Sequence, residues 1–322
     1  MSVLVTGVAG FIGAEVAGAL LARGEAVVGV DNFSDQYDPV LKFARLKTLR
    51  EDKGFSFLEA DVADREAMAA LAAKHPDLDR IVHLAAHSGV RQSMADPYVY
   101  VQTNVMGHLV MLELARGLKD LKHFVYASAS SVYGANRKLP FAVADPVDHP
   151  VSLYAATKRA DELMAETYAH LYGLKATGLR YFTTYGPWGR PDMSPYVFAK
   201  AIHEGRPIEL THLGFIKRDY SYIDDIVAGT LAVLDTPPAD AGHRIYNLGA
   251  ARSEDIVQVI SLFEQALGKT AIVELKPGEP GTLQETAADI ADTTRDFGWT
   301  PRVTVEEGIP KFVEWFKAYN RL

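Results

Sequence analysis

Tyr154 and Lys158 are the residues whose types and spacing first suggest chemistry. They stand four residues apart in a segment with helical periodicity, so both side chains lie on one face of the expected helix. A tyrosine with a pKa of about 10 is a poor base at neutral pH, but an ammonium group one turn away favours the phenolate and lowers that pKa. Such a pair can take a proton from a sugar or alcohol hydroxyl. The pattern is common by chance and becomes specific only with a second feature.

That second feature is a glycine loop near the N-terminus. Gly7, Gly10 and Gly13 follow a short apolar run with the spacing G-x-x-G-x-x-G and open a helical segment. Glycines there let the backbone approach a pyrophosphate at a helix N-terminus, where free N–H groups favour an anion. Asp31 ends the next apolar run, 18 residues after Gly13. A carboxylate at this place accepts hydrogen bonds from an adenosine ribose and repels a 2′-phosphate. We therefore predict a dinucleotide site that prefers NAD over NADP; a structural glycine turn is the alternative.

Serines 128, 130 and 131 follow the fifth expected strand. Ligands of open α/β sheets bind at the carboxyl ends of the strands. We therefore interpret this cluster as a source of hydroxyl groups for a ligand. A solvated serine turn is the alternative interpretation.

Asp61 and Val62 follow the third expected strand. On spacing alone they either flank an adenine or provide the aspartate that caps a helix starting at Arg65. Arg190 lies in a loop rich in proline and glycine, where it either contacts a ligand or is a surface charge.

The elements that must position these groups alternate in the first half of the chain. Strands are expected at 3–6, 26–30, 55–58, 80–84, 123–127 and 176–180, and helices at 11–23, 65–74, 97–118 and 153–172. This alternation predicts βαβ units in a parallel sheet, and the nearly continuous apolar strands indicate helices on both faces. Shorter helices are expected at 197–204, 226–234, 256–267 and 305–319, with a Pro/Gly-rich segment at 276–282.

The predicted fold class is therefore α/β, a Rossmann-type doubly wound parallel sheet with a smaller C-terminal substrate-binding lobe. Residues 1–180 form the expected dinucleotide-binding domain and residues 181–322 form most of the lobe, with an interwoven boundary.

Composition excludes several classes of protein. The 322 residues are 48% hydrophobic and 23% charged, which is typical of a globular protein with a sizeable core. The net charge of −8 argues against nucleic acid or an anionic membrane as the main partner. The chain has no cysteine, so disulfides, thiolate metal sites and cysteine nucleophiles are excluded. Without a signal peptide, an apolar span or histidines at ligand spacing, we expect a cytoplasmic protein without a metal.

Longer strings resemble a known family. The glycine loop, the serine cluster and the Tyr154–Lys158 pair together look like an extended short-chain dehydrogenase/reductase over the full length of the chain. The strings DHPVSLYAATK at 148–158, YFTTYGPWGRPDM at 181–193 and RDYSYIDD at 218–225 resemble UDP-glucuronate 4-epimerases in particular. These motifs are long, so chance agreement is improbable.

The resemblance implies a role for individual positions. Residues implied to bind NAD are Gly7, Gly10, Phe11, Ile12, Gly13, Asp31, Asn32, Asp61, Val62, Leu84, Ala85, Ala86, Asn104, Tyr154 and Lys158. Residues implied to contact the UDP-sugar are Val90, Arg91, Ser130, Ser131, Thr183, Arg190 and Arg218. Tyr154 would be the base, with Lys158 at the nicotinamide ribose. A homodimer is also implied, through the helices at 97–118 and from 153.

Ala129 is the one position that departs from the pattern of this family in a way that concerns catalysis. Members of the family usually have a serine or threonine there, whose hydroxyl bonds the reacting sugar oxygen. Either Ser130 or Ser131 supplies that hydroxyl, which makes these two serines candidate catalytic residues, or the chain is a natural or engineered variant with weakened activity. A lost transition-state hydrogen bond costs on the order of 10²–10³ in rate.

The expected reaction is C4 epimerisation of UDP-glucuronate to UDP-galacturonate through a transient 4-keto sugar. Three alternatives remain open: a UDP-glucuronate decarboxylase, a 4-epimerase of neutral UDP-hexoses, and a nucleotide-sugar-binding protein without activity. The uronate reaction carries a hazard, because a 4-keto uronate is a β-keto acid that can lose carbon dioxide. Candidates for holding the carboxylate against this loss are Ser130, Ser131, Thr183 and Arg190.

Overall fold

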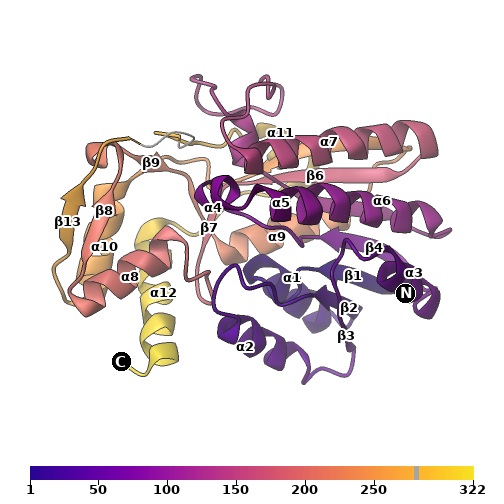
Figure 1. The fold of residues 1–322 in the computed structure, drawn as a ribbon, viewed down its shortest axis with the longest axis horizontal. Helices are drawn as coiled ribbons and strands as arrows, with labels where there is room; N and C mark the ends of the chain where they lie inside the picture. The colour runs from indigo at the N-terminus through magenta and orange to yellow at the C-terminus, as the bar shows by residue number, and fades with distance from the viewer. Residues whose placement is uncertain (279–282) are drawn as a thin grey trace.

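Seven strands form the central sheet of the computed structural model, which describes residues 1–278 and 283–322 (Figure 1). In spatial order they are β11 (Gly242–Leu248), β6 (Lys175–Tyr181), β5 (His123–Ala129), β4 (Leu78–His83), β1 (Ser2–Thr6), β2 (Ala26–Asp31) and β3 (Phe55–Glu59). All neighbouring pairs are parallel, so every strand ends at the same edge. The strand order reverses at β1, which confirms the predicted Rossmann-type fold.

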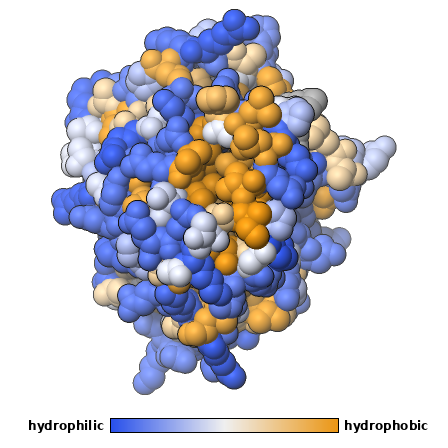
Figure 2. Space-filling view, turned by 90° about the vertical axis from the view of Figure 1, so that its left-hand side faces the viewer, coloured by the Kyte–Doolittle hydropathy of each residue, from blue (hydrophilic) through white to orange (hydrophobic). Residues whose placement is uncertain are grey.

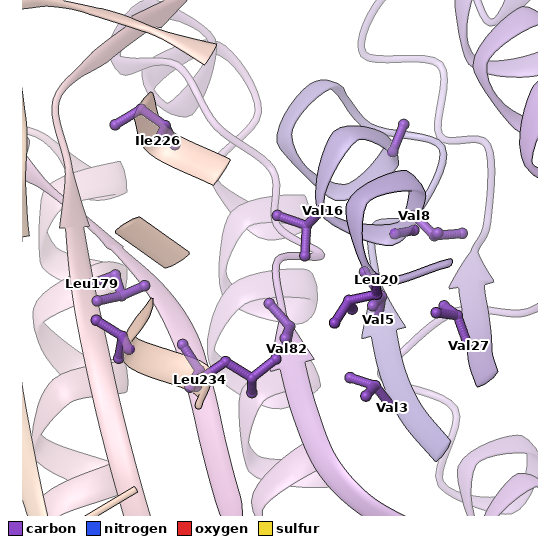
Figure 3. Packing of buried hydrophobic residues seen from close by; sticks show 14 of the residues in the cluster. Val3, Val5, Val8, Val16, Leu20, Val27, Val82, Leu179, Ile226 and Leu234 are labelled. Carbon is purple, nitrogen blue, oxygen red and sulfur yellow. The ribbon is translucent and has the colours of Figure 1, made fainter. Parts of the chain in front are cut away.

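Helices cover both faces of this sheet, as the apolar strands predicted (Figure 1). One face carries α1 (Phe11–Ala22), α2 (Val40–Leu49) and α9 (Ile223–Leu234); the other carries α3 (Arg65–Lys74), α6 (Gly107–Gly117) and α7 (Leu153–Tyr172). In β1, Val3 and Val5 belong to the hydrophobic cluster that includes α1, and Leu4 belongs to the cluster that includes α6. Figure 3 shows Val16 and Leu20 of α1 packed over these valines. The strand is therefore buried on both sides.

A smaller lobe stands beside the sheet and has its own core. It contains α8 (Ser194–Glu204), α10 (Ile256–Leu267) and α12 (Val305–Asn320), packed around Phe263 and Phe312. Three two-stranded sheets belong with it: β7 (Thr183–Tyr185) with β10 (Tyr220–Tyr222), β9 (Lys217–Arg218) with β12 (Glu254–Asp255), and β8 (Pro207–Leu210) with β13 (Ile272–Leu275). Apolar side chains gather on the outer face of this lobe (Figure 2), where the exposed Ile272, Val273 and Leu275 of β13 lie.

Several elements differ from the sequence-based expectations. Helix α2, α4 (Val90–Ala95), α11 (Ala291–Phe297) and strand β11 were not predicted, and β11 returns residues of the second half to the main sheet. The predicted helix at 97–118 is divided into α5 (Pro97–Tyr100), a π-helical turn η1 (Val101–Met106) and α6. Strand β5 runs straight into a 3₁₀ turn, η2 (Ser130–Tyr133). The end of the Pro/Gly-rich segment 276–282 lies outside the described residues.

Asn104 ties the π-helical turn to two distant segments of the chain. Asn104 is buried and accepts from the backbone N–H of His87 at 2.8 Å, while its amide donates to the His87 carbonyl at 3.0 Å and to Thr157 Oγ1 at 2.9 Å. The widened turn therefore connects the loop after β4 to helix α7. None of the helices in the described part of the chain has the length and apolar character that a membrane crossing requires.

Replacing Leu20 with alanine tests the contribution of the α1–sheet core. Leu20 is fully buried, so Leu20→Ala leaves a cavity and is expected to lower the free energy of unfolding by about 2–5 kcal/mol in urea titrations followed by circular dichroism. The control is Val257→Ala on α10, where the side chain is 59% exposed and the change should stay below about 0.5 kcal/mol. Equal effects of the two changes would contradict the assignment of the core.

Candidate active site

A cleft of about 440 Å³ runs along the carboxyl edge of the sheet, between the sheet and the smaller lobe. Most of the residues singled out in the sequence line it, although they come from distant parts of the chain. They are Gly7, Gly10, Phe11, Ile12, Gly13, Asp31, Asn32, Val62, Leu84, Ala85, Ala86, Val90, Ser130, Ser131, Tyr154, Lys158, Thr183 and Arg190. The parallel sheet brings them together because all its strands end here.

The glycine turn after β1 leaves no room for side chains. Gly7 has φ +68°, and a Cβ on it would lie 2.8 Å from the backbone nitrogen of Ala85. A Cβ on Gly13 would lie 2.1 Å from the Gly7 carbonyl oxygen, and Gly10 caps α1 without any side-chain hydrogen bond. The first turn of α1 thus faces the cleft with bare backbone, which fits the pyrophosphate of a dinucleotide.

Asp31 lies beside this turn at the end of β2. Its carboxylate accepts from the backbone N–H groups of Ala9 at 3.0 Å and Phe33 at 2.9 Å, which holds it at the cleft wall. A carboxylate oxygen has lone pairs left for a ribose hydroxyl, so the residues present fit NAD. Lys42 of α2, which the sequence did not single out, also lines the cleft and donates to the carbonyl oxygen of Ser34 at 2.7 Å.

Asp61 and Val62 had two interpretations, a contact with adenine and a cap for helix α3, and the structure excludes the second for Asp61. Asp61 does not cap α3: that role belongs to Asp64, whose side chain accepts from Glu66 N and Ala67 N. Asp61 instead accepts from the Asn32 side chain at 3.1 Å, next to the cleft, while Val62 lines it.

Tyr154 and Lys158 lie on the first turns of α7, at the bottom of the cleft. Ser152 caps this helix by accepting from Ala155 N at 3.1 Å. The ammonium group of the buried Lys158 is 3.0 Å from Asp161 Oδ2. Burial raises the pKa of Tyr154 to about 12; the Arg190 guanidinium acts to lower it and the Asp161 carboxylate acts to raise it. The cation that favours the phenolate in this structure is therefore Arg190, because Lys158 is paired with Asp161.

Ser128 and Ser131 differ in whether the hydroxyl already has a hydrogen-bond partner within the protein. Ser128 Oγ donates to Glu162 Oε1 at 2.7 Å, so this hydroxyl is committed inside the protein. Ser131 Oγ is buried and lacks a hydrogen-bond partner within the described residues, although it belongs to the lining of the cleft. An unpaired buried hydroxyl carries a desolvation cost that a bound ligand can remove. Ser130 and Ser131 both line the cleft, and of these two Ser131 is the one whose buried hydroxyl lacks a partner among the described residues.

Arg190 is not a surface charge. Its side chain is 17% exposed, pairs with both oxygens of Asp192 and donates to Ser88 Oγ. It also lies over the ring of Tyr37, 5.6 Å from the centroid. Sequence spacing could not reveal Tyr37 or Ser88, because both reach this arginine across the cleft from loops far away in the chain.

Four of the singled-out residues lie outside the lining of the cleft. Asn104 is enclosed beneath it, Asp61 stands behind Asn32, and Arg91 is exposed on α4. Arg218 of β9 donates to the backbone carbonyls of Lys217 at 2.9 Å and Gln284 at 3.0 Å. Among the described residues there is no group of three or more His, Asp or Glu side chains that could hold a metal ion.

The sheet order and the glycine turn at its switch point define a Rossmann-type α/β protein. Residues 3–249 match the model of the NAD dependent epimerase/dehydratase family, and the chain belongs to that family.

Individual relatives show a more specific similarity than the family model does. The chain is 42% identical to a probable UDP-glucuronate 4-epimerase of Rhizobium meliloti, over 100% of this chain and 98% of the relative. It is equally identical to UDP-glucuronate 4-epimerase 4 of Arabidopsis thaliana, over 99% of this chain and 76% of the relative. Among solved structures, UDP-glucuronic acid 4-epimerase from Bacillus cereus, in complex with UDP-glucuronic acid and NAD, superposes with a TM-score of 0.90 at 32% identity, covering 99% of this chain and 100% of that one.

Replacing Gly13 with alanine tests the glycine turn. A Cβ there meets the Gly7 carbonyl oxygen, so Gly13→Ala should purify with much less bound NAD than wild type, as measured by releasing and quantifying the nucleotide. The matched control is Gly18→Ala on the same helix, where a Cβ would meet only Leu49 Cδ2 at 3.8 Å. Wild-type NAD content in folded Gly13→Ala would contradict the assignment.

Proposed function

We propose that this protein is an NAD-dependent UDP-glucuronate 4-epimerase, an isomerase that interconverts UDP-glucuronate and UDP-galacturonate. The observation that carries the proposal is one cleft that joins a glycine turn to a tyrosine, an unpaired serine hydroxyl and a buried arginine. The relatives named as UDP-glucuronate 4-epimerases over the full length of the chain support the same substrate.

In this proposal the residues of the cleft divide the work. The glycine turn holds the cofactor pyrophosphate and Asp31 holds the adenosine ribose. NAD, when bound at the glycine turn, would supply reversible hydride transfer at C4, so the reaction has no net redox change. Tyr154 removes the C4 hydroxyl proton and returns it to the C4 oxygen after the 4-keto sugar has turned, and the turned sugar would receive the hydride on the opposite face of C4. Ser131 donates to the C4 oxygen in place of the hydroxyl that Ala129 lacks.

Retention or loss of the sugar carboxylate distinguishes an epimerase from a decarboxylase. A 4-keto uronate keeps its carboxylate only if the bond to that group is held away from the orientation that favours cleavage. Arg190 and Thr183 line the same cleft as the serine turn and can hold a carboxylate by charge and by hydrogen bonding. Arg190 is itself fixed by Asp192, which restricts its movement. We therefore assign carboxylate binding to Arg190, Thr183 and Ser130, since the single hydroxyl hydrogen of Ser131 is used at the C4 oxygen.

The product of the reaction tests the proposal. Purified protein mixed with UDP-glucuronate, without added cofactor, should form UDP-galacturonate, separated by anion-exchange chromatography. Tyr154→Phe should lower the rate by about 10²–10⁴-fold, because the base is lost while the cleft is kept.

Other outcomes of this assay would assign a different function to the protein. A UDP-pentose would make the protein a decarboxylase, and conversion of UDP-glucose alone would make it an epimerase of neutral hexoses. Binding of UDP-glucuronate without conversion, in both the wild type and Ala129→Ser, would leave only a binding protein.

We also propose that the protein is a homodimer paired through α7 and the neighbouring elements α5 and η1. Large apolar side chains are exposed on these adjacent elements, among them Tyr98, Val101, Leu163 and Leu171. The outer sides of α6 and α7 lie next to each other (Figure 1), so two copies can form a four-helix interface. The cytoplasmic location and the division at residue 180 stay predictions.

Leu171→Glu should convert the dimer to a monomer in sedimentation velocity, because a charge enters the apolar interface. Leu213→Glu is the control, since Leu213 is similarly exposed on the smaller lobe. Dissociation by Leu213→Glu alone would move the interface to the apolar face of Figure 2.

A further inference from the structure

Glu162 is a buried carboxylate for which the proposed reaction has no use. It lies one helical turn after Lys158 on α7, with 1% of its surface exposed. Oε1 accepts from Ser128 Oγ at 2.7 Å and from Arg180 Nε at 2.8 Å; Oε2 accepts from Arg180 Nη2 at 2.9 Å and from Arg159 Nη1 at 3.1 Å. Burial acts to raise the pKa of Glu162, but the hydrogen bonds and positive charge of Arg180, together with Ser128 and Arg159, hold the pKa below the ordinary value. The group is therefore an anion at neutral pH.

The two main partners of Glu162 stand side by side on the sheet. Ser128 of β5 and Arg180 of β6 are register partners, both nearly inaccessible to solvent. Both strands reach the cleft here: Ser128 itself lines it, as does Tyr181, which follows Arg180, and Ser131 and Thr183 line it three residues further on. One carboxylate therefore connects the helix that carries Tyr154 and Lys158 to the carboxyl ends of both strands.

Arg180 also reaches the far end of the serine turn. Its guanidinium lies 4.8 Å from the centroid of the Tyr133 ring, and Tyr133 is the last residue of η2. Tyr133 is in turn fixed by its hydroxyl, which donates to Asn247 Oδ1 of β11 at 2.6 Å. The turn from Ser130 to Tyr133 is thus held at its start through Ser128 and at its end through Arg180.

Stability alone does not account for this arrangement. Taking a carboxylate and a guanidinium out of water is costly, and apolar side chains of similar volume often stabilise a protein as well or better. An apolar replacement would not fix the relative orientation of the two groups, whereas charge-assisted bidentate hydrogen bonds add geometric specificity. The site needs that specificity, because Ala129 leaves the reaction dependent on Ser131.

We propose that Glu162, Arg180 and Ser128, here called the Glu162 network, position the serine turn relative to the catalytic helix. Glu162 and Arg180 are positioning residues that act through Ser128 and Tyr133. The inference rests on the proposed function for its kinetic readout, but the positioning itself is measurable without substrate.

Ser128→Ala removes one bond of the network and leaves the Glu162–Arg180 pair intact. We expect kcat to fall about 10-fold with KM within about twofold, because a small displacement of Ser131 affects the transition state more than substrate binding. Amide hydrogen exchange of residues 129–134, followed by mass spectrometry in the absence of substrate, should become faster. Ser2→Ala is the control: Ser2 is also a buried strand serine, but lies at the amino end of β1. Wild-type kcat or wild-type exchange in Ser128→Ala would overturn the proposal.

A double variant separates positioning from stability. Glu162→Met alone leaves Arg180 buried and unpaired and should lower the Tm strongly, whereas Glu162→Met with Arg180→Met should recover most of it. The double variant should nevertheless keep a low kcat and fast exchange in the serine turn. Recovery of wild-type kcat and exchange together with the Tm would show that the pair is only structural. If wild-type protein does not convert UDP-glucuronate, the proposed function fails while the exchange measurements still decide this inference.

Discussion

The parallel register of the central sheet is the constraint on which the rest of the structure depends. Because every strand ends at the same edge, residues separated by more than 150 positions meet in one cleft. The closest approach is at the switch point, where the turn after β1 passes so near the chain after β4 that Gly7 cannot carry a side chain. A cofactor that occupies this edge is then bound largely by backbone, and the side chains further along remain for the chemistry.

Three pairs of opposite charges lie around the cleft. Lys158 pairs with Asp161, Arg180 with Glu162 and Arg190 with Asp192. Each pair avoids the cost of an isolated buried ion and fixes one wall of the site. The first belongs to α7, the second joins α7 to the sheet, and the third belongs to the loop between β7 and α8. A ligand that enters therefore meets charges whose positions are already restricted, so it does not bear the cost of ordering them.

The alanine at position 129 can be understood in this setting. The buried backbone of β5 continues unchanged through Ala129, which is 7% exposed, and the next hydroxyls follow in the turn η2. Ser128 is committed to Glu162, while Ser131 has no partner in the described chain. In the proposed mechanism, the function of the missing hydroxyl passes to Ser131, two positions later, and we infer that its place depends on how the turn is held.

Local sequence patterns determined much of this protein. The apolar runs and helical periodicities predicted six of the seven strands of the main sheet and most helices, and the glycine spacing predicted the dinucleotide site, because backbone sterics and burial on both faces act over a few residues. Many other residues of the cleft followed from the resemblance of longer strings to a known family. What only the tertiary structure decided depends on groups distant in the chain. Strand β11 joins the sheet by pairing with β6, Arg190 meets Ser88, and Glu162 meets Ser128 and Arg180. A sequence shows that such side chains exist, but the pairing of buried charges is set by the three-dimensional packing that brings them within hydrogen-bonding distance.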